Sequence, residues 1–388
     1  MQTTYKFNRR TDGIDFSKIR IYNALVSKIP GSIDLTLGEP DFSTPPHICK
    51  AAKEAIDQGF THYVPTPGIP ELRKAISDKL RRQNGIETDP NSDILVTVGA
   101  AEATTLTMQS LINEGDEVLV PDPVFDSYIP NILLAGGKPV SLPLSKPGFR
   151  LDPEQLTKRV NEKTRMIVLN SPSNPTGAII DTNDQKEILD IATKNNLFIL
   201  SDEVYEDIVY DGYKHHSIAS FAEGLSRCIT IFSFSKAYAM TGWRVGYVVA
   251  SNEIITKMTM LHRNIVGHPT SIVQRAALAA LTGPQDSVRA MVQEFDRRRI
   301  FLLEALEELN VPCYRPKGAF YMFPSVQEFR EDSGIIAESL AKEGAVTVPG
   351  SAFGVCGEGH LRISYATSME RLAKAAKSIE RWVISHRR

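Results

Sequence analysis

The sequence predicts an α/β protein, with a large α/β/α domain built on a mostly parallel sheet and a smaller α/β domain beside it. From about residue 93 onward, short apolar segments alternate with helix-like segments, as strands linked by crossover helices do. After residue 250 the pattern turns helical, and a second strand and helix pattern follows near the C-terminus. The chain has 388 residues, which suits more than one domain and a large buried core.

The N-terminal segment 1–30 is expected to form an arm and a short helix, because its apolar residues keep a rough helical period. A strand is expected over 33–37, and Pro45-Pro46 opens a helix over 46–58. A charged amphipathic helix is expected over 70–82, after a loop dense in proline and glycine.

The regular part of the chain supplies the strands of the predicted large domain. They are expected over 94–98, 117–120, 165–169, 197–200, 228–234 and 245–250. Polar motifs follow most of these strands directly. In open α/β sheets, ligands bind at the carboxyl ends of the strands, so these motifs are expected to converge in space.

The C-terminal part is expected to be helical first and then α/β again. The expected helices are 254–261, 271–281, 288–309 and 369–386, and the expected strands are 319–323, 345–348 and 361–365. The run Arg297-Arg298-Arg299 is expected on a solvated helix face. The predicted division is an arm with part of the small domain over 1–45, a large domain over 46–284 and a small C-terminal domain over 285–388.

The composition is that of a soluble globular protein, with 42% hydrophobic and 23% charged residues. The formal net charge is −2, from 44 basic and 46 acidic residues, so the chain lacks the basic field that nucleic acid or anionic lipid attracts. No apolar run reaches the ~18–20 residues of a membrane span, and residues 1–10 lack the apolar core of a signal peptide. We therefore expect a cytoplasmic protein without nucleic-acid or membrane partners.

The cysteines and histidines do not follow the spacing of a metal site, and no metal is predicted. The cysteines, which form no CxxC motif, are Cys49, Cys228, Cys313 and Cys356. We expect them to be reduced thiols of a cytoplasmic protein. His215 and His216 lie in a polar loop and are expected to be solvated.

The stretch 230–247 carries the clearest chemical signal. Lys236 comes at the exit of a buried strand, where a desolvated ammonium is costly unless it is paired or neutral. Such desolvation lowers the pKa of an amine and makes it a nucleophile. Ser233, Ser235 and Arg244 add hydroxyl and guanidinium donors of the kind that bind phosphate. A nucleophilic amine beside a phosphate site is what pyridoxal 5′-phosphate requires, although a surface lysine that caps a strand would fit the same residues.

Further polar residues follow other predicted strands. Asp202 ends a buried strand, where its carboxylate could pair with a pyridinium nitrogen or cap a helix. Ala100 and Ala101 open a helix after Gly99, and the free N–H groups of such a helix start bind phosphate. Arg362 lies within a strand, where a half-buried arginine suits bidentate capture of a carboxylate or a structural ion pair.

Taken together, these motifs resemble the class I/II pyridoxal-phosphate-dependent aminotransferases of fold type I. The motifs are Ser-Phe-Ser-Lys with an arginine eight residues on, Ser-Pro-Ser-Asn-Pro-Thr-Gly, Ser-Asp-Glu-Val-Tyr and Arg-Ile-Ser-Tyr-Ala, in the family's order. The similarity is strongest to the aspartate/aromatic branch of bacteria and archaea, and it extends from Leu37 to Arg362. It implies that residues 46–284 bind the cofactor and that the protein moves an α-amino group from an amino acid to a 2-oxo acid.

The resemblance implies a role for each matching residue around the cofactor ring. Lys236 would hold the cofactor aldehyde as an internal aldimine and, once freed, move the proton between the substrate α-carbon and cofactor C4′. Asp202 would pair with the pyridine nitrogen, and Asn174 and Tyr205 would bond the ring 3′-oxygen. Phe125 would stack on the ring face, where the family often has Trp or Tyr.

The resemblance also implies binding sites for two anionic groups. The residues expected to hold the cofactor phosphate are Ala100, Ala101, Ser233, Ser235 and Arg244. Arg362, helped by Asn174 and the Gly38 backbone, would take the substrate α-carboxylate. Tyr63 matches a tyrosine that reaches the phosphate of the neighbouring subunit, which implies a homodimer with shared active sites.

The chain departs from part of this branch at one position. Some aspartate-specific members carry a lysine just after the glycine pair near 99–101 and use it for the distal carboxylate, whereas this chain has Ala101 followed by Glu102. The change favours an aromatic or apolar amino donor, with aspartate as a second candidate. If 2-oxoglutarate is the acceptor, as the family implies, another arginine, lysine or set of hydroxyls must hold its distal carboxylate.

Other functions fit parts of the same pattern. A carbon–sulfur β-lyase would use the same fold and cofactor, and it would release pyruvate and ammonia from cystathionine without an added 2-oxo acid. A non-catalytic cofactor-binding regulator is disfavoured, because the sequence shows neither an N-terminal winged helix nor a basic patch. A Rossmann dehydrogenase is disfavoured, because no GxGxxG motif follows the early strands.

Overall fold

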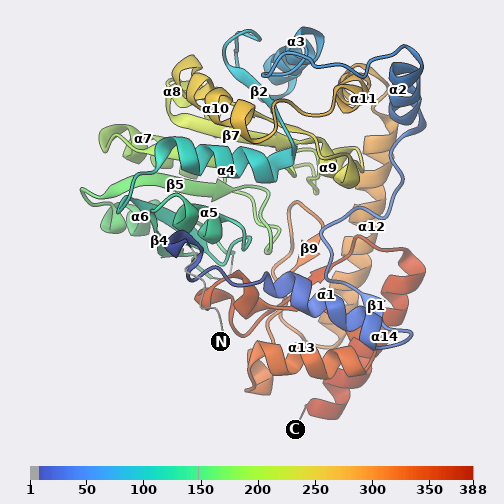
Figure 1. Ribbon diagram of the computed structural model, residues 1–388. Helices are drawn as coiled ribbons and strands as arrows, with labels where there is room; N and C mark the ends of the chain where they lie inside the picture. Colours follow the sequence, from blue (N-terminus) through green and yellow to red (C-terminus); the bar gives the residue numbers. More distant parts are fainter. Residues whose placement is uncertain (1–7, 147, 388) are drawn as a thin grey trace, which may run out of the picture.

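A seven-stranded, mostly parallel sheet forms the upper part of the computed structural model, which describes residues 8–146 and 148–387 (Figure 1). Helices cover both faces of this sheet, and two smaller sheets lie below it with helices of their own (Figure 1). The predicted fold class is therefore confirmed. Among the helices of the described residues, none combines the length and the apolar character that crossing a membrane requires.

The strands of the large sheet lie in the order β2-β8-β7-β6-β5-β3-β4, and all except β8 point the same way. Their bounds are β2 Ile94–Thr97, β3 Glu117–Asp122, β4 Lys138–Pro143, β5 Thr164–Asn170, β6 Phe198–Asp202, β7 Cys228–Ser233 and β8 Gly246–Val249. The sequence did not predict β4, because Pro139 and Pro143 argue against a central strand. In the structure β4 is an edge strand, where proline is tolerated.

Side chains alternate across the sheet and fill a core on each face. On β5, Ile167 and Leu169 belong to one buried cluster, whereas Met166 and Val168 belong to another. The helices of this part are α2 Pro46–Asp57, α3 Pro70–Lys79, α4 Gly99–Leu111, α5 Tyr128–Leu134, α6 Pro153–Arg159, α7 Thr182–Lys194, α8 Gly224–Arg227, α9 Phe234–Ala237, α10 Asn252–Ile265 and α11 Ser271–Thr282. Helix α3 continues as a π-helical turn over Leu80–Asn84.

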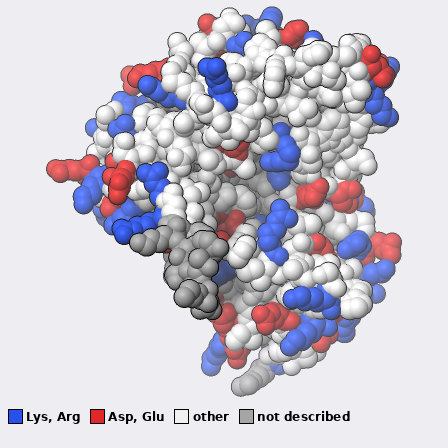
Figure 2. Space-filling view, viewed as in Figure 1, with Lys and Arg blue, Asp and Glu red and all other residues white. Residues whose placement is uncertain are grey.

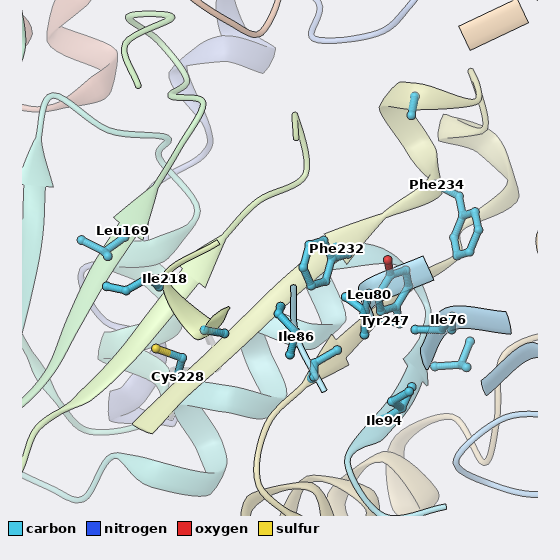
Figure 3. Close-up of a cluster of buried hydrophobic side chains, with 14 of the residues drawn as sticks. Ile76, Leu80, Ile86, Ile94, Leu169, Ile218, Cys228, Phe232, Phe234 and Tyr247 are labelled. Atoms are coloured by element: carbon cyan, nitrogen blue, oxygen red, sulfur yellow. The ribbon is translucent and has the colours of Figure 1, made fainter. Parts of the chain in front are cut away.

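The core on one face supports the end of β7, from which the chain enters the candidate site. Phe232 on β7 and Tyr247 on β8 are register partners, and their rings stack with centroids 5.0 Å apart. Figure 3 shows the two rings beside Leu80 and Ile86, which come from the segment after α3. The packing fixes the strand end that precedes Lys236.

The smaller part joins the N-terminal and C-terminal segments of the chain. Its strands are β1 Ile33–Asp34, β9 Tyr321–Met322, β10 Ala345–Val346, β11 Val348–Pro349 and β12 Leu361–Ser364, and its helices are α1 Lys18–Lys28, α12 Asp286–Glu308, α13 Ser333–Lys342 and α14 Met369–His386. Strand β1 pairs in parallel with β10, so these N-terminal and C-terminal segments lie side by side. The boundaries at residues 45 and 284 stay a prediction.

The arginine run on α12 does not lie on a solvated face as predicted. Arg299 is fully buried and pairs with Asp211 and Asp296, and Arg298 is 5% exposed and pairs with Asp41. Successive residues on a helix point about 100° apart, so three neighbours cannot share one face. Of the three, Arg297 is the one that is largely exposed.

The expectation that His215 is solvated is wrong as well. Its side chain is 7% exposed, and its Nε2 lies 2.6 Å from the Glu203 carboxylate. Glu203 is itself buried directly after β6 and also accepts hydrogen bonds from Ser201 and Ser217. A buried carboxylate needs such partners, which explains why the loop folds inward at His215. His216 is exposed, as predicted.

Candidate active site

A pocket of about 640 Å³ opens between the large sheet and the smaller part of the molecule. Figure 2 shows the molecule hollowed on this face, between its upper and lower parts. Every predicted site residue except Tyr63 lines the pocket: Gly38, Ala100, Ala101, Phe125, Asn174, Asp202, Tyr205, Ser233, Ser235, Lys236, Arg244 and Arg362. The motifs meet because most of them follow parallel strands, whose carboxyl ends share one edge of the sheet.

Lys236 lies in the short helix α9, immediately after β7. The Ser233 hydroxyl caps this helix by accepting a hydrogen bond from the Ser235 N–H. The Lys236 amine donates to the Gly38 carbonyl oxygen over 2.5 Å. Desolvation lowers the pKa of Lys236 to about 8, against the opposing effect of the nearby carboxylates. A fraction of the amine is therefore neutral near pH 7 and available as a nucleophile or base.

Asp202 ends β6 with a buried carboxylate. Its Oδ2 accepts a hydrogen bond from the Tyr128 hydroxyl over 2.5 Å, and its Oδ1 accepts from the Val204 N–H over 3.2 Å. Burial raises the pKa of Asp202 to about 6, although these hydrogen bonds act in the opposite direction. A cationic partner, such as a protonated ring nitrogen, would stabilise the anionic form of this carboxylate.

Arg244 marks one end of the pocket, beside the start of helix α4. Gly99 has a φ of +76°, which favours glycine, and a Cβ at this position would lie 2.6 Å from the Arg244 guanidinium. Ala100 and Ala101 follow in the first turn of α4, where N–H groups lack intrahelical partners. With the Ser233 and Ser235 hydroxyls, these groups can bind a phosphate.

Glu102, next to Ala101, does not line the pocket, because its side chain contacts other parts of the large domain. Its carboxylate accepts a hydrogen bond from the Val98 N–H over 2.6 Å and lies 2.8 Å from His262 Nδ1. A carboxylate near a helix N-terminus is favourable, and here it also satisfies a backbone donor. The negative charge after Ala101 is thus directed away from the candidate substrate.

Arg362 marks the other end of the pocket, on β12. The sequence predicted it to be half-buried, but it is fully buried between the rings of Tyr321 and Phe353, with its guanidinium carbon 4.6 and 4.8 Å from their centroids. Its Nη1 donates to the Asn174 side chain over 3.0 Å, and its Nη2 donates to the Thr36 carbonyl. Its Nε is buried and has no hydrogen-bond partner among the described residues.

Two tyrosines that the sequence did not single out extend the site. Tyr128 fixes Asp202, and the hydroxyl of Tyr321 on β9 lies 2.7 Å from that of Tyr205. A Cβ on Gly38 would lie 2.2 Å from the Tyr321 hydroxyl, so glycine is needed there. No local sequence signal marks either tyrosine, because each reaches the site through tertiary packing. The N-terminal segment also lines the pocket, through Ser17, Ile19, Arg20 and Asn23.

Tyr63 lies outside the pocket in this single chain. Its side chain is 96% exposed and contacts the His268 ring edge-on, with centroids 5.7 Å apart. Within the described part of the chain, no group of three or more His, Cys, Asp or Glu side chains is placed to hold a metal ion.

The arrangement combines an amine of lowered pKa, a buried carboxylate and two cationic ends. One end suits a phosphate and the other a carboxylate. These groups fit a phosphorylated pyridine aldehyde, in which Lys236 would face the aldehyde and Asp202 the ring nitrogen, while Arg362 would bind the carboxylate of an amino acid.

Comparisons with known proteins agree with this geometry. The family model for aminotransferase class I and II matches residues 30–379. An aspartate aminotransferase of Pyrococcus abyssi is 45% identical over 376 residues, which cover 96% of this chain and 97% of that protein. Aromatic-amino-acid aminotransferase 2 of Thermococcus litoralis is 44% identical over 376 residues, which also cover 96% of this chain and 97% of that protein. The crystal structure of an aromatic aminotransferase from Pyrococcus horikoshii superposes with a TM-score of 0.90 at 44% identity, covering 95% of this chain and 99% of that one.

The chain belongs to the class I and II aminotransferases. It is a pyridoxal 5′-phosphate-dependent transaminase that acts on amino acids. The predicted family, cofactor and enzyme class are thus confirmed. The relatives named for aspartate and for aromatic amino acids are almost equally similar, so overall identity does not select the amino donor.

Proposed function

We propose that this aminotransferase takes its amino group chiefly from aromatic or apolar amino acids and passes it to 2-oxoglutarate. The observation that carries the proposal is the uncharged Ala101 in the pocket wall, at the position where some aspartate-specific members of the family carry a lysine for the distal carboxylate. Aspartate is the second candidate donor, since a relative with 45% identity is named an aspartate aminotransferase.

We propose the following division of work among the residues. When bound, the cofactor supplies an aldehyde that links to amines and a ring that withdraws electrons from the substrate α-carbon. Lys236 Nζ would hold the aldehyde and, when free, would be the amine that moves a proton between the substrate α-carbon and cofactor C4′. Asp202, oriented by Tyr128, keeps the ring nitrogen protonated. Tyr205, oriented by Tyr321, and Asn174 bond the ring oxygen.

The remaining residues position the two anionic groups. The phosphate donors are Ala100, Ala101, Ser233, Ser235 and Arg244, and Phe125 packs against the ring. Arg362 binds the substrate α-carboxylate, with Asn174 and the Gly38 backbone beside it. The contact between Lys236 and the Gly38 carbonyl supports this placement, because it joins the amine to the carboxylate end of the pocket.

The test of the reaction compares products. With phenylalanine, tyrosine or aspartate and 2-oxoglutarate, we expect glutamate to form in a 1:1 ratio with the new 2-oxo acid, fastest with an aromatic donor. With cystathionine and no acceptor, we expect no continuous release of pyruvate and ammonia. Steady release would favour the carbon–sulfur lyase, and a strong preference for aspartate would contradict the proposed donor.

We also propose that two subunits share their active sites through Tyr63. The support is its exposure, since an aromatic side chain that is 96% exposed in one chain is available to a partner. Tyr63→Phe is expected to weaken cofactor retention by about 10- to 100-fold, the effect of losing one hydrogen bond to a charged phosphate. Tyr213→Phe is the matched control, because Tyr213 is also exposed and does not line the pocket.

Mixing Tyr63→Phe with Lys236→Ala subunits separates a shared site from an unshared one. If the site is shared, one site of each hybrid combines Lys236 of one subunit with Tyr63 of the other and is native. Half of the sites in the hybrids should then regain wild-type cofactor retention and turnover. If every active site in the mixture keeps the weak retention of Tyr63→Phe, Tyr63 acts within its own subunit or has no role.

We propose a cytoplasmic location on the basis of the cysteines. Cys49, Cys228, Cys313 and Cys356 are all free thiols, and Cys228 is fully buried. Free thiols are typical of a reducing compartment. Cell fractionation with an antibody against the native protein checks this location.

A further inference from the structure

Among the described residues, four basic side chains line the pocket, and three already have a place in the proposed function. Lys236 lies at the aldehyde position, Arg244 lies beside the helix start at the phosphate end, and Arg362 lies at the α-carboxylate end. The fourth is Arg20, on helix α1 of the N-terminal segment.

Arg20 belongs to one face of α1 that is directed toward the pocket. Ser17, Arg20 and Asn23 all line the pocket, and their spacing of three residues puts them on the same side of a helix. Ile19 lines the pocket as well, whereas Lys18 and Ile21 do not. The helical period therefore accounts for the presence of Arg20 in the pocket.

Hydrogen bonds fix this face on both sides of Arg20. The Ser17 hydroxyl donates to Asp126, next to Phe125, over 2.5 Å. The Asn23 amide donates to Asp34 over 2.9 Å and to the Thr36 hydroxyl over 3.0 Å. The carbonyl of the same Thr36 accepts a hydrogen bond from Arg362, so one residue connects the face that carries Arg20 to the α-carboxylate end.

The guanidinium of Arg20 is available for a ligand. Arg20 is exposed, and no hydrogen bond or ion pair joins its side chain to any other residue of 8–146 or 148–387. The buried arginines of α12 differ, because their guanidinium groups are taken up by Asp41, Asp211 and Asp296. A guanidinium with free donors at the edge of an anion pocket suits bidentate binding of a carboxylate.

We propose that Arg20 binds the distal carboxylate of a dicarboxylic substrate whose α-carboxylate is bound by Arg362. The inference rests on the proposed function and deepens it, since it supplies the cation that Ala101 does not provide. Arg20 thus selects a 2-oxo dicarboxylic acid over a 2-oxo monocarboxylic acid as acceptor.

The test compares two acceptors in the Arg20→Gln holoenzyme. The kcat/KM for 2-oxoglutarate should fall by about 10- to 100-fold, as expected for one charged hydrogen-bonding partner. The kcat/KM for phenylpyruvate, which has no distal carboxylate, should stay unchanged. Lys18→Gln is the matched control, because it removes a positive charge from the same helix at a side chain outside the pocket. It should leave both values unchanged.

Binding of unreactive acids provides a second readout by calorimetry on the holoenzyme. Glutarate and pentanoate have equal chain lengths and differ in the second carboxylate. The wild-type protein should bind glutarate more tightly, and Arg20→Gln should lose this preference. The role of Arg20 would be overturned if Arg20→Gln still bound glutarate more tightly than pentanoate by the same factor. It would also be overturned if kcat/KM fell equally for 2-oxoglutarate and phenylpyruvate. A wild-type protein that transaminates with neither acceptor would instead contradict the proposed function.

Discussion

The Lys236→Ala variant is expected to fold, to retain its cofactor weakly and to lose transamination by about four orders of magnitude or more. The side chain provides the amine that would hold the cofactor aldehyde, and the same amine is the base nearest to the proposed α-carbon position. The amine also lies at the exit of β7, in a pocket where desolvation lowers its pKa to about 8. A lysine on the surface would not be desolvated in this way. The measurement is kcat/KM with phenylalanine and 2-oxoglutarate.

The control for this variant is Lys257→Ala, on the exposed face of α10. It should keep full activity, while circular dichroism should show that both variants fold. Added small amines should partly restore turnover in Lys236→Ala alone, because they can replace the missing proton carrier. Near-normal transamination by Lys236→Ala without added amine would contradict the assignment.

Replacing Asp202 by asparagine is expected to lower kcat by about 10²- to 10⁴-fold with little change in the fold. Asparagine has the same shape and can keep one hydrogen bond with Tyr128, but it cannot carry the negative charge that holds a proton on the ring nitrogen. The electron-withdrawing capacity of the bound cofactor should fall as a result. The measurement is single-turnover kinetics with a saturating amino acid.

Tyr128→Phe separates the charge of Asp202 from its orientation. It removes one hydrogen bond to Oδ2 and keeps the carboxylate, so about a tenfold loss is expected. The pH dependence of the bound cofactor's absorbance should shift strongly in Asp202→Asn and slightly in Tyr128→Phe. Equal effects in the two variants would mean that the charge of Asp202 is not the relevant property.

Much of the fold could be predicted because local patterns and the tertiary structure agree. Helix α14 has the predicted bounds Met369–His386, since its strong amphipathic pattern begins at Ser368, whose hydroxyl caps the helix. The alternation of apolar and helix-like segments likewise predicted most strands of the large sheet. Strand β4 was missed because its prolines are acceptable at an edge, and position in the sheet cannot be inferred from the segment alone.

The candidate site likewise contains some residues that the sequence predicts and others that it does not. Lys236, Asp202 and Asn174 could be predicted because each lies at or just after the end of a strand, and parallel strands end at one edge. Tyr128, Tyr321 and Arg20 could not be, because each comes from an element whose pocket-facing side is decided by packing between distant segments. The same limitation explains the misplaced Arg299, whose partner Asp211 lies far away in the sequence.

The measurement that tests the central claim most directly is the visible absorption spectrum of the purified protein during titration with a single amino acid and no acceptor. We expect a band of the lysine-bound cofactor that disappears with phenylalanine or tyrosine, with one 2-oxo acid released per site, and that returns when 2-oxoglutarate is added. A protein that shows no such band after incubation with pyridoxal 5′-phosphate, or whose band no amino acid changes, would contradict the role of Lys236 and the account built on it.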